Sequence, residues 1–281
     1  VTFDATPGGT FDAVNGGTLT IGGLGVGPAA SAMSLANVEG NLGFTSLNVF
    51  NHNASSEALS IDNFGGPAYD GSQGFLLTVA DGSVGSNQDG LFVEQATINM
   101  SLSSFTASGG NNAGIRLQNV AGDLTFDNAT ISDGLGGVTL SNTTANVTYH
   151  GSIGPHPGGD GDVIDISNMT AGTVIFDTGT ISTEQGSAGL SFNSISGGSI
   201  TIDDVNIGQT TPVTNEAISF FGNTGGSLTI NNLDLATNDA TGINGQSANT
   251  TGFTFNVGTG NLQSSSATLS ATPIALNNIN T

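Results

Sequence analysis

Short runs of alternating apolar and polar residues, separated by Gly, Asn, Asp and Thr, recur along the chain. The segment 198–220 contains three such runs. A period of two places the apolar side chains on one face of a β-strand, so each run predicts a short strand. Three such strands joined by turns would make one coil. The apolar pairs of this segment are Ile200 and Ile202, Val205 and Ile207, and Ile218 and Phe220.

The third run of this unit recurs at a nearly constant interval. Met33 and Ile274 are nine repeats apart, which gives a period of roughly 27 residues, within the range typical of solenoids. The lead residues of the third run are Phe11, Met33, Leu59, Leu91, Ile115, Val138, Ile164, Leu190, Ile218, Ile243 and Ile274.

The first two runs of each unit share an apolar spacing of two, three and two residues. Copies of this spacing are Leu19, Ile21, Leu24 and Val26; Leu42, Phe44, Leu47 and Val49; Leu77, Val79, Gly82 and Val84; Leu124, Phe126, Ala129 and Ile131; Val174, Phe176, Gly179 and Ile181; and Leu228, Ile230, Leu233 and Leu235.

A single coil cannot bury its own apolar edge, so the coils must stack on one another. We therefore predict an all-β fold, a right-handed parallel β-helix (β-solenoid) of about eleven coils with three short strands per coil. Residues 1–281 form one domain, and a surface-loop insertion lies at about 65–74. Val1 and Phe3 are expected on the first strand of the first coil, and residues 9–17 on its third strand and closing turn.

An Asn-rich column lies four residues after the lead residue of the third run. Asn tolerates the left-handed backbone of a tight turn, and stacked Asn side chains can bond to their copies in adjacent coils. An internal Asn ladder at a turn is favoured over a polar binding groove. The predicted ladder consists of Asn15, Asn37, Asn63, Asn119, Asn142, Asn168 and Asn278, while Gln95, Ser194, Gly222 and Ser247 occupy the same position in other coils.

The charge balance excludes several partners. One basic residue, Arg116, stands against 22 acidic residues, for a net charge of -21. Phosphate groups of nucleic acids or of an anionic membrane surface could not be neutralised by such a chain. No apolar run is long enough to span a bilayer, so membrane insertion is not expected. The chain has no Cys, which rules out disulfides and is compatible with secretion by a route that does not use them.

Two segments of the chain resemble repeats of known proteins. They are 223–230, Asn-Thr-Gly-Gly-Ser-Leu-Thr-Ile, and 196–202, Ser-Gly-Gly-Ser-Ile-Thr-Ile. The chain resembles the right-handed parallel β-helix (pectin-lyase-like) superfamily, and these segments are similar to β-strand repeats of large bacterial secreted and cell-surface proteins. The resemblance implies the architecture and an extracellular or cell-surface location. It does not select one function, because the same solenoid carries enzymes, adhesins and fibres.

No residue set predicts catalysis. Lyases of the resembled superfamily are expected to combine carboxylates that hold Ca²⁺ with an Arg or Lys base, but this chain has no Lys, and Arg116 should point outward from a third strand. Glycoside hydrolases need paired carboxylates. Asp203 and Asp204 are such a pair, yet their place between two strands favours turn chemistry. We therefore predict that the protein is not an enzyme and has no catalytic residues.

One loop is a candidate metal site. His150 and His156 lie close to Asp160 and Asp162, and the two Asp side chains could offer oxygens to Ca²⁺. The alternative is a Pro- and Gly-rich loop whose polar residues meet water, and this interpretation is favoured. No other cofactor is expected.

The ends of the predicted solenoid suggest an assembly. Solenoids that stay monomeric need polar caps, and no amphipathic helix precedes Val1 or follows Ile279. By phase, Val1 of a second copy could continue the coils after Thr281; trimmed coil ends of a longer protein would give the same phase. The predicted polymer interface consists of Val1, Phe3, Ile274, Leu276 and Ile279.

The function predicted from these features is that of a non-enzymatic extracellular structural protein. It would be a subunit of a filament or matrix, or an adhesin stalk, and would assemble by end-to-end stacking of β-helices into a homopolymer. Glycans or a cell surface are further candidate partners. The alternative is a carbohydrate-binding or carbohydrate-active β-helix protein.

Overall fold

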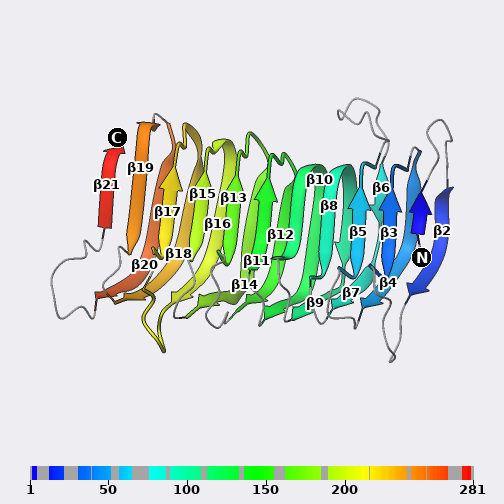
Figure 1. Ribbon diagram of the computed structural model, residues 1–281, viewed down its shortest axis with the longest axis horizontal. Coiled ribbons are helices and arrows are strands. Elements are labelled where there is room, and N and C mark those ends of the chain that lie inside the picture. The colour runs from blue at the N-terminus through cyan, green and yellow to red at the C-terminus, as the bar shows by residue number, and fades with distance from the viewer. Residues whose placement is uncertain are drawn as a thin grey trace.

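The computed structural model describes residues 2–4, 13–21, 31–38, 40–51, 57–64, 76–86, 89–108, 113–132, 136–154, 162–184, 189–214, 216–238, 242–250, 252–264 and 274–279. Within these ranges the regular secondary structure is entirely β, so the predicted all-β class is confirmed. The strands stack side by side along the long axis, with the N-terminal strands at one end and the C-terminal strands at the other (Figure 1).

Twenty-one strands make up this part of the chain, and all belong to one sheet. They are β1 (Thr2–Asp4), β2 (Ala13–Ile21), β3 (Met33–Ala36), β4 (Leu42–Asn51), β5 (Leu59–Asp62), β6 (Leu77–Val79), β7 (Gly82–Ser86), β8 (Leu91–Leu102), β9 (Ser104–Ser108), β10 (Ala113–Ser132), β11 (Gly136–Ser141), β12 (Asn146–Ile153), β13 (Ile164–Ser167), β14 (Thr173–Thr183), β15 (Leu190–Asn193), β16 (Ser196–Ile207), β17 (Ile218–Phe221), β18 (Gly225–Thr237), β19 (Ile243–Thr250), β20 (Thr254–Ser264) and β21 (Ile274–Ile279).

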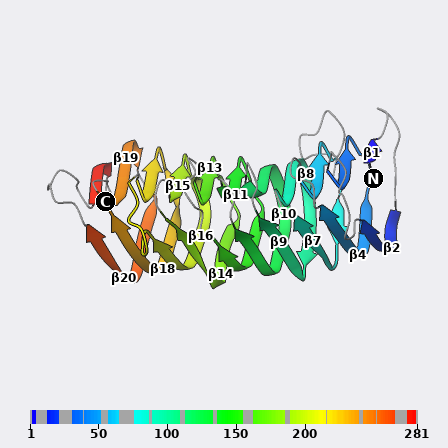
Figure 2. The same cartoon turned by 60° about the horizontal axis from the view of Figure 1, so that its bottom comes forward.

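The strands pair in columns, and every pairing is parallel. One column joins the third strands in the order β1, β3, β5, β8, β10, β11, β13, β15, β17, β19 and β21. The first and second strands form the other columns, which begin at β2 and β4 and end at β18 and β20. Figure 2 shows the two layers that result. The molecule is therefore a parallel β-solenoid, as predicted; its right-handed sense stays a prediction.

The number of coils depends on how neighbouring strands are divided. At three strands per coil, the 21 described strands amount to about seven coils and not the predicted eleven. The difference arises because predicted strands merge around bends: β10 runs for 20 residues through a third strand, a turn and the next two strands. Counted along the third-strand column, eleven described strands follow one another from β1 to β21.

Alternation of side chains builds the core. In β3 and β5 the residues at every second position, including Met33, Leu35 and Ile61, are fully buried. Aromatic rings stack along part of the first-strand edge of this core. Phe126 and Tyr149 have ring centroids 6.3 Å apart, and Tyr149 and Phe176 have centroids 5.9 Å apart. The sequence pattern thus places one continuous apolar column inside the coils.

The predicted lead residues of the third strand are confirmed as one column from the second coil onward. Direct pairing joins Met33, Leu59, Leu91, Ile115, Val138, Ile164, Leu190, Ile218, Ile243 and Ile274 in this order.

The prediction for the first coil is wrong. Phe3 pairs with Leu35, so β1 is a third strand and not a first strand. Leu19 pairs with Leu47, five residues away from the predicted alignment with Leu42. The local alternation of apolar residues permits both alignments, and pairing with the neighbouring coil decides between them.

Second-strand register also changes within the rod. Ile181 pairs with Val205, and Thr183 pairs with Ile207. The predicted spacing had aligned Ile181 with Ile207. A shift of two residues keeps every side chain on its face of the sheet, so the alternation pattern cannot distinguish the two registers.

The predicted insertion at 65–74 lies outside the described residues. In the part of the chain that the structure describes, no helix has the length and apolar character needed to cross a membrane.

Candidate functional site

The Asn-rich column forms the turn between the third strand of one coil and the first strand of the next. Asn37, Asn63, Asn119, Asn142 and Asn168 all have positive φ between 49° and 54°. Three of the four other residues at this position behave in the same way, with φ of 52° at Gln95, 56° at Ser194 and 67° at Gly222. Asn is favoured here because it tolerates the left-handed conformation.

Backbone bonds lock these turns to each other. Asn142 N–H donates to the carbonyl of Ser167, at 3.0 Å, and Asn168 N–H donates to the carbonyl of Asn193, at 2.9 Å. A side-chain contact of the predicted ladder type joins Asn63 Nδ2 to Asn37 Oδ1 at 3.5 Å. The column therefore holds successive coils in register, which is a structural task.

Two predicted members of the ladder differ. Asn15 lies within β2, a strand that pairs with β4, so it does not occupy the turn. Its assignment was wrong because the first coil was misaligned. Asn278 lies within β21, and its side chain is outside the described part of the structure.

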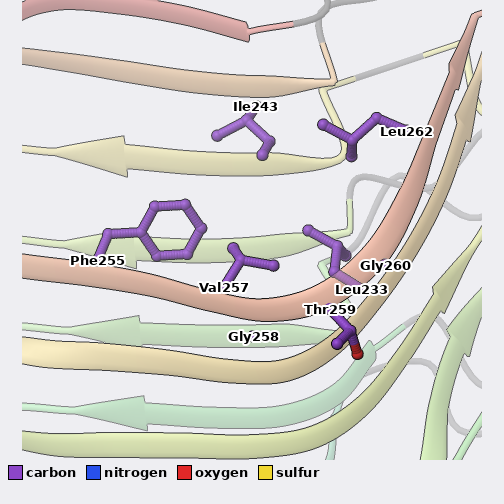
Figure 3. Close-up of a pocket in the computed structure, with 8 residues that line it drawn as sticks. All are labelled: Leu233, Ile243, Phe255, Val257, Gly258, Thr259, Gly260 and Leu262. Carbon is purple, nitrogen blue, oxygen red and sulfur yellow. The ribbon is translucent and has the colours of Figure 1, made fainter.

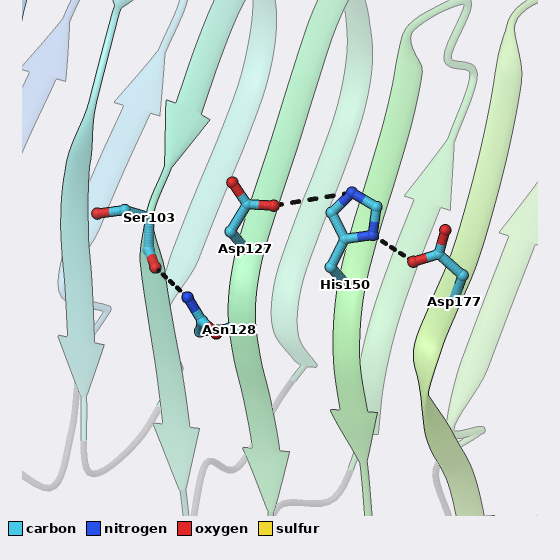
Figure 4. Close-up of polar contacts among 5 residues, drawn as sticks. All are labelled: Ser103, Asp127, Asn128, His150 and Asp177. Atoms are coloured by element: carbon cyan, nitrogen blue, oxygen red, sulfur yellow. Dashed lines mark hydrogen bonds and ion pairs between the residues drawn. The ribbon is translucent and has the colours of Figure 1, made fainter.

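His150 lies between two carboxylates at the bend between first and second strands (Figure 4). Its Nδ1 contacts Asp177 Oδ1 of the following coil. Its Nε2 lies 3.7 Å from Asp127 Oδ1 of the preceding coil. Both ring nitrogens therefore face carboxylates of the same molecule. A histidine that acts as a general base needs one nitrogen directed toward a substrate, so this geometry indicates a contact that links three coils.

Arg116 points outward from its third strand, as predicted, and two groups hold it. Its Nη2 lies 3.8 Å from Glu57 Oε1, and its guanidinium carbon lies 4.1 Å from the centre of the Phe92 ring. Ser31 also donates a hydrogen bond to Glu57. An arginine bound in this way cannot approach a substrate as a base without losing both contacts.

Asp162 belongs to a small, partly buried cluster, whereas Asp160 and His156 lie outside the described residues. Burial raises the pKa of Asp162 to about 6, and the nearby Asp165 carboxylate adds to the rise. Burial also raises the pKa of Asp165. The Ser191 hydroxyl bonds to these carboxyls, and Asp165 Oδ1 is buried without a hydrogen-bond partner.

The Ca²⁺ site predicted at Asp160 and Asp162 stays a prediction, because Asp160 lies outside the described residues. Within the described residues, no group of three or more His, Asp or Glu side chains is arranged to hold a metal ion. Ca²⁺ takes six to eight oxygen ligands, and Asp162 alone of the two predicted ligands is described.

Neutral donors satisfy many of the exposed carboxylates. Asp203 accepts a hydrogen bond from Asn231 at 2.7 Å, and Asp204 accepts bonds from Asn232 at 2.7 Å and from Thr180 at 2.9 Å. Each of these donors lies on a neighbouring coil. The same arrangement recurs with Asn146 on Asp123, Asn244 on Glu216 and Asn261 on Asp234.

These contacts account for two features of the sequence. Side-chain amides and hydroxyls take the place of Lys and Arg as partners of the acidic residues. The Asp203 and Asp204 pair, which was a candidate hydrolase pair in sequence and was assigned to a turn, lies within β16, and both carboxylates accept hydrogen bonds from neighbouring coils.

An apolar hollow opens at the C-terminal end of the core (Figure 3). It has a volume of about 440 Å³. Two of its side chains are among the most exposed large apolar groups of the described residues: Val257 is 43% exposed and Leu262 is 46% exposed. The hollow is lined by Leu233, Ile243, Phe255, Val257, Gly258, Thr259, Gly260 and Leu262.

The strand edge beside this hollow has no partner among the described strands. Among the described strands, β20 pairs with β18 on one side and with no strand on the other. A parallel strand has backbone N–H and C=O groups on both edges, so the free edge of β20 can accept a further strand. Within the described residues, this region thus combines an apolar hollow with a strand edge to which no second strand is paired.

The predicted interface residues occupy the two ends of the third-strand column. Phe3 lies in β1, the first strand of that column, and Ile274, Leu276 and Ile279 lie in β21, the last. Their side chains, and Val1 as a whole, are outside the described residues.

Sequence reasoning missed several contacts that signals in the chain could have shown. Asp127, His150 and Asp177 each follow the second inward residue of a first strand, so a full alignment of the coils would have placed them side by side. Glu57 and Arg116 are 59 positions apart and offered no such signal. The apolar hollow beside β20 was not predicted, because Gly258 and Gly260 interrupt the two-three-two apolar spacing there.

The fold and these contacts define a parallel β-solenoid whose last described coils border an apolar hollow. Comparison of the chain with models of protein families, with curated proteins and with solved structures found no match.

Proposed function

We propose that this protein is a non-enzymatic structural subunit that stacks end to end into a β-solenoid filament, in extracellular or cell-surface material such as a matrix or an adhesin stalk. The observation that carries the proposal is the open end at β20. There, Val257 and Leu262 remain about half exposed beside an unpaired strand edge. A coil laid on this end would cover both features, and we assign that coil to a second copy of the chain.

Two contributions to the free energy favour such a contact. Complete burial of a Leu side chain contributes about 1.5–3 kcal/mol, so covering the exposed half of Leu262 contributes about 1 kcal/mol. Val257 and the hollow beside it add to this term. The eleven residues of β20 would also gain parallel backbone hydrogen bonds. A solenoid that stays monomeric needs a polar cap to block such an edge.

The polar contacts support a structural role over catalysis. His150, Arg116 and Asp204 are each bound by groups of the same chain, mostly on neighbouring coils. The sequence has no Cys and one basic residue, a composition compatible with an extracellular product that folds without disulfides.

The test compares two substitutions that both place a charge on an exposed apolar residue. Leu262→Asp puts an unpaired carboxylate into the proposed contact, where its burial costs several kcal/mol. Phe221→Asp is the matched control, because Phe221 is 61% exposed and lies on the side of the rod.

Sedimentation and electron microscopy give the readout. We expect the unaltered chain and Phe221→Asp to form filaments with an axial repeat near 50 Å, about eleven strand spacings. Leu262→Asp should remain a folded single rod. A chain that stays monomeric at high concentration, or a Leu262→Asp variant that assembles normally, would contradict the proposal.

A carbohydrate-binding function is the second candidate, and Phe221 favours it. Its exposed ring lies beside Asn193 of the preceding coil. Aromatic faces and amides are the groups that commonly hold sugar rings. Binding on a glycan array that is lost in Phe221→Ala would support this function, and an array without binding would speak against it.

A further inference from the structure

The sequence contains seven Asn-x-Ser/Thr motifs, and the proposed function gives them no role. This motif is the acceptor of N-linked sugars, and it must lie on the protein surface to be used. The structure describes the side chains of five of the seven Asn residues, and those of Asn53 and Asn249 are outside the described residues. The seven are Asn53, Asn99, Asn128, Asn142, Asn146, Asn168 and Asn249.

We propose that Asn142 and Asn168 are acceptor sites for an N-linked sugar, which a transferase delivers from an activated sugar phosphate. Both belong to the Asn-rich turn column, with φ of 51° and 53°. In the coils where Asn37, Asn63 or Asn119 holds this place, the residue two positions later is Glu, Gly or Ala, so those turns carry no motif. The inference goes beyond filament formation and does not depend on it.

Both motifs present their two polar side chains to solvent. In each, the Asn and the Thr are exposed, while the residue between them is fully buried. The buried residues are Thr143 and Met169. A transferase that reads the motif must reach the Asn amide and the Thr hydroxyl together. The turn after the third strand holds both groups on the outside of the same coil.

The hydrogen bonds that hold these two turns leave the side-chain amides out. Within the described residues, Asn142 and Asn168 are held through their backbone N–H groups, which donate to the carbonyls of Ser167 and Asn193. Each exposed amide nitrogen can therefore turn toward a sugar without the loss of a contact that holds the coils together.

The other three described motifs have Asn side chains that are already engaged. Asn146 Nδ2 donates to Asp123 Oδ1 at 2.8 Å, and Asn128 Nδ2 donates to the Ser103 carbonyl at 3.0 Å. Asn99 Oδ1 accepts the Asp123 N–H at 3.1 Å, and this Asn is only partly exposed. A sugar at any of these places requires the release of a bond between coils. The structure thus separates two free acceptors from three engaged ones, which the sequence motif alone cannot do.

The transfer is a substitution at the anomeric carbon of the sugar. A bond forms between that carbon and the Asn Nδ2 atom, and the bond from the carbon to the phosphate oxygen breaks. The phosphate leaves with the electron pair, and one amide proton passes to a base of the transferase. Nothing is oxidised or reduced. The chain supplies the amide and the Thr hydroxyl by which the transferase holds the motif.

The two acceptors lie side by side. Ser141 pairs with Ser167 directly before them, so Asn142 and Asn168 are about one strand spacing, 4.8 Å, apart. A sugar on one therefore crowds the other, and each site must be tested with its neighbour removed. Both follow strands in the middle of the rod, β11 and β13 (Figure 1), so a sugar there leaves the hollow beside β20 uncovered.

Transfer of a hexose to the purified, folded chain tests the inference. The probe is UDP-glucose with a soluble transferase that reads Asn-x-Ser/Thr, and peptide mapping by mass spectrometry locates the added hexose. Asn142→Gln and Asn168→Gln each leave one acceptor. Gln fits this turn, because Gln95 holds the same place with φ of 52°. Thr170→Ala is the matched control, since it keeps Asn168 and removes only the exposed hydroxyl. Unfolded peptides of the chain are treated in parallel.

We expect hexose on Asn168 in the Asn142→Gln variant and on Asn142 in the Asn168→Gln variant. Asn128 and Asn146 should carry about tenfold less in the folded chain, because a hydrogen bond must first be released there, while the unfolded peptides should be modified at all of these places. Thr170→Ala should lose the hexose at Asn168 alone.

Two outcomes in the folded chain would overturn the inference. One is equal modification of Asn128, Asn142, Asn146 and Asn168, and the other is modification of the unfolded peptides alone. The same mapping of the protein from its natural source should find sugar on Asn142 or Asn168, and unmodified peptides at both places would also overturn it. None of these readouts changes with the presence or absence of filaments, so the proposed function stands or falls separately.

Discussion

Asn223 offers a sharp test of how the coils are held together. It is fully buried in the turn that follows β17. Its Oδ1 accepts a hydrogen bond from Ile195 N–H at 2.7 Å, and its Nδ2 donates to the Phe192 carbonyl at 3.0 Å. Both partners belong to the preceding coil. Asn223→Ala removes both bonds and leaves a buried donor and a buried acceptor without these partners.

The expected loss follows from these two groups. A buried polar group left unsatisfied costs about 1–3 kcal/mol. Two such groups give about 2–6 kcal/mol, and we expect a value near 3 kcal/mol, because removal of the side chain lets water reach one of them. Urea unfolding followed by circular dichroism measures the change, with the slope of the transition as a check that the same surface unfolds.

Hydrogen exchange locates the effect. The Ile195 amide should lose protection in Asn223→Ala by more than amides of the distant N-terminal coils. Asn231→Ala is the control, because Asn231 is exposed and donates its bond to a partly exposed Asp203 at 2.7 Å. It should change stability by less than about 0.5 kcal/mol. Equal stability of the two variants, with unchanged exchange at Ile195, would refute the reasoning.

Three further variants test other parts of the structure. Folding raises the pKa of Asp162 from 3.8 to about 6, so the folded state binds more protons between these values and stability falls as pH rises through them; Asp162→Asn should reduce this fall in melting temperature relative to the unaltered chain. Gly151→Ala would place a Cβ 1.9 Å from the Ala129 carbonyl oxygen, and we expect a loss of about 1–3 kcal/mol in urea unfolding. Arg116→Gln breaks an exposed ion pair at 3.8 Å and a cation–π contact, so its cost in the same assay should stay below about 1.5 kcal/mol.

The core of the solenoid could be predicted because its signal is local. A strand with one buried face must alternate apolar and polar residues, and a stack of coils must repeat that alternation at a fixed interval. The lead residues from Met33 to Ile274 satisfied both conditions, and all of them pair in the predicted order. The Asn-rich turn was predictable for a similar reason. A turn position with positive φ favours residue types that tolerate the left-handed conformation, and Asn is one of them.

Register could not be predicted in the same way. Leu19 was aligned with Leu42 and pairs with Leu47, and Ile181 was aligned with Ile207 and pairs with Val205. In the second case the alternatives differ by two residues, which leaves every side chain on its face. The choice between them depends on how residues of adjacent coils fill the interior, and that information lies outside any single strand.

The contact of Arg116 with Glu57 depended on register and was beyond the sequence, whereas the contacts of His150 join equal places of successive coils. His150 meets Asp127 and Asp177 across two coil boundaries, and Arg116 meets Glu57 over a separation of 59 positions. A contact across this many positions can be predicted only when the exact number of residues in every intervening loop and its place in the coils are known.

The sequence by itself determined the all-β class, the parallel stacking, the inward face of most strands and the conformation of the turn column, because a period of two and a tolerance for positive φ are properties of short segments. Tertiary structure alone decided which residue lies above which, that β1 is a third strand, and that an apolar hollow lies beside β20. Pairing between coils made these choices, since a parallel ladder can slide by two residues without exposing its apolar face, and only the fit between neighbouring coils fixes it.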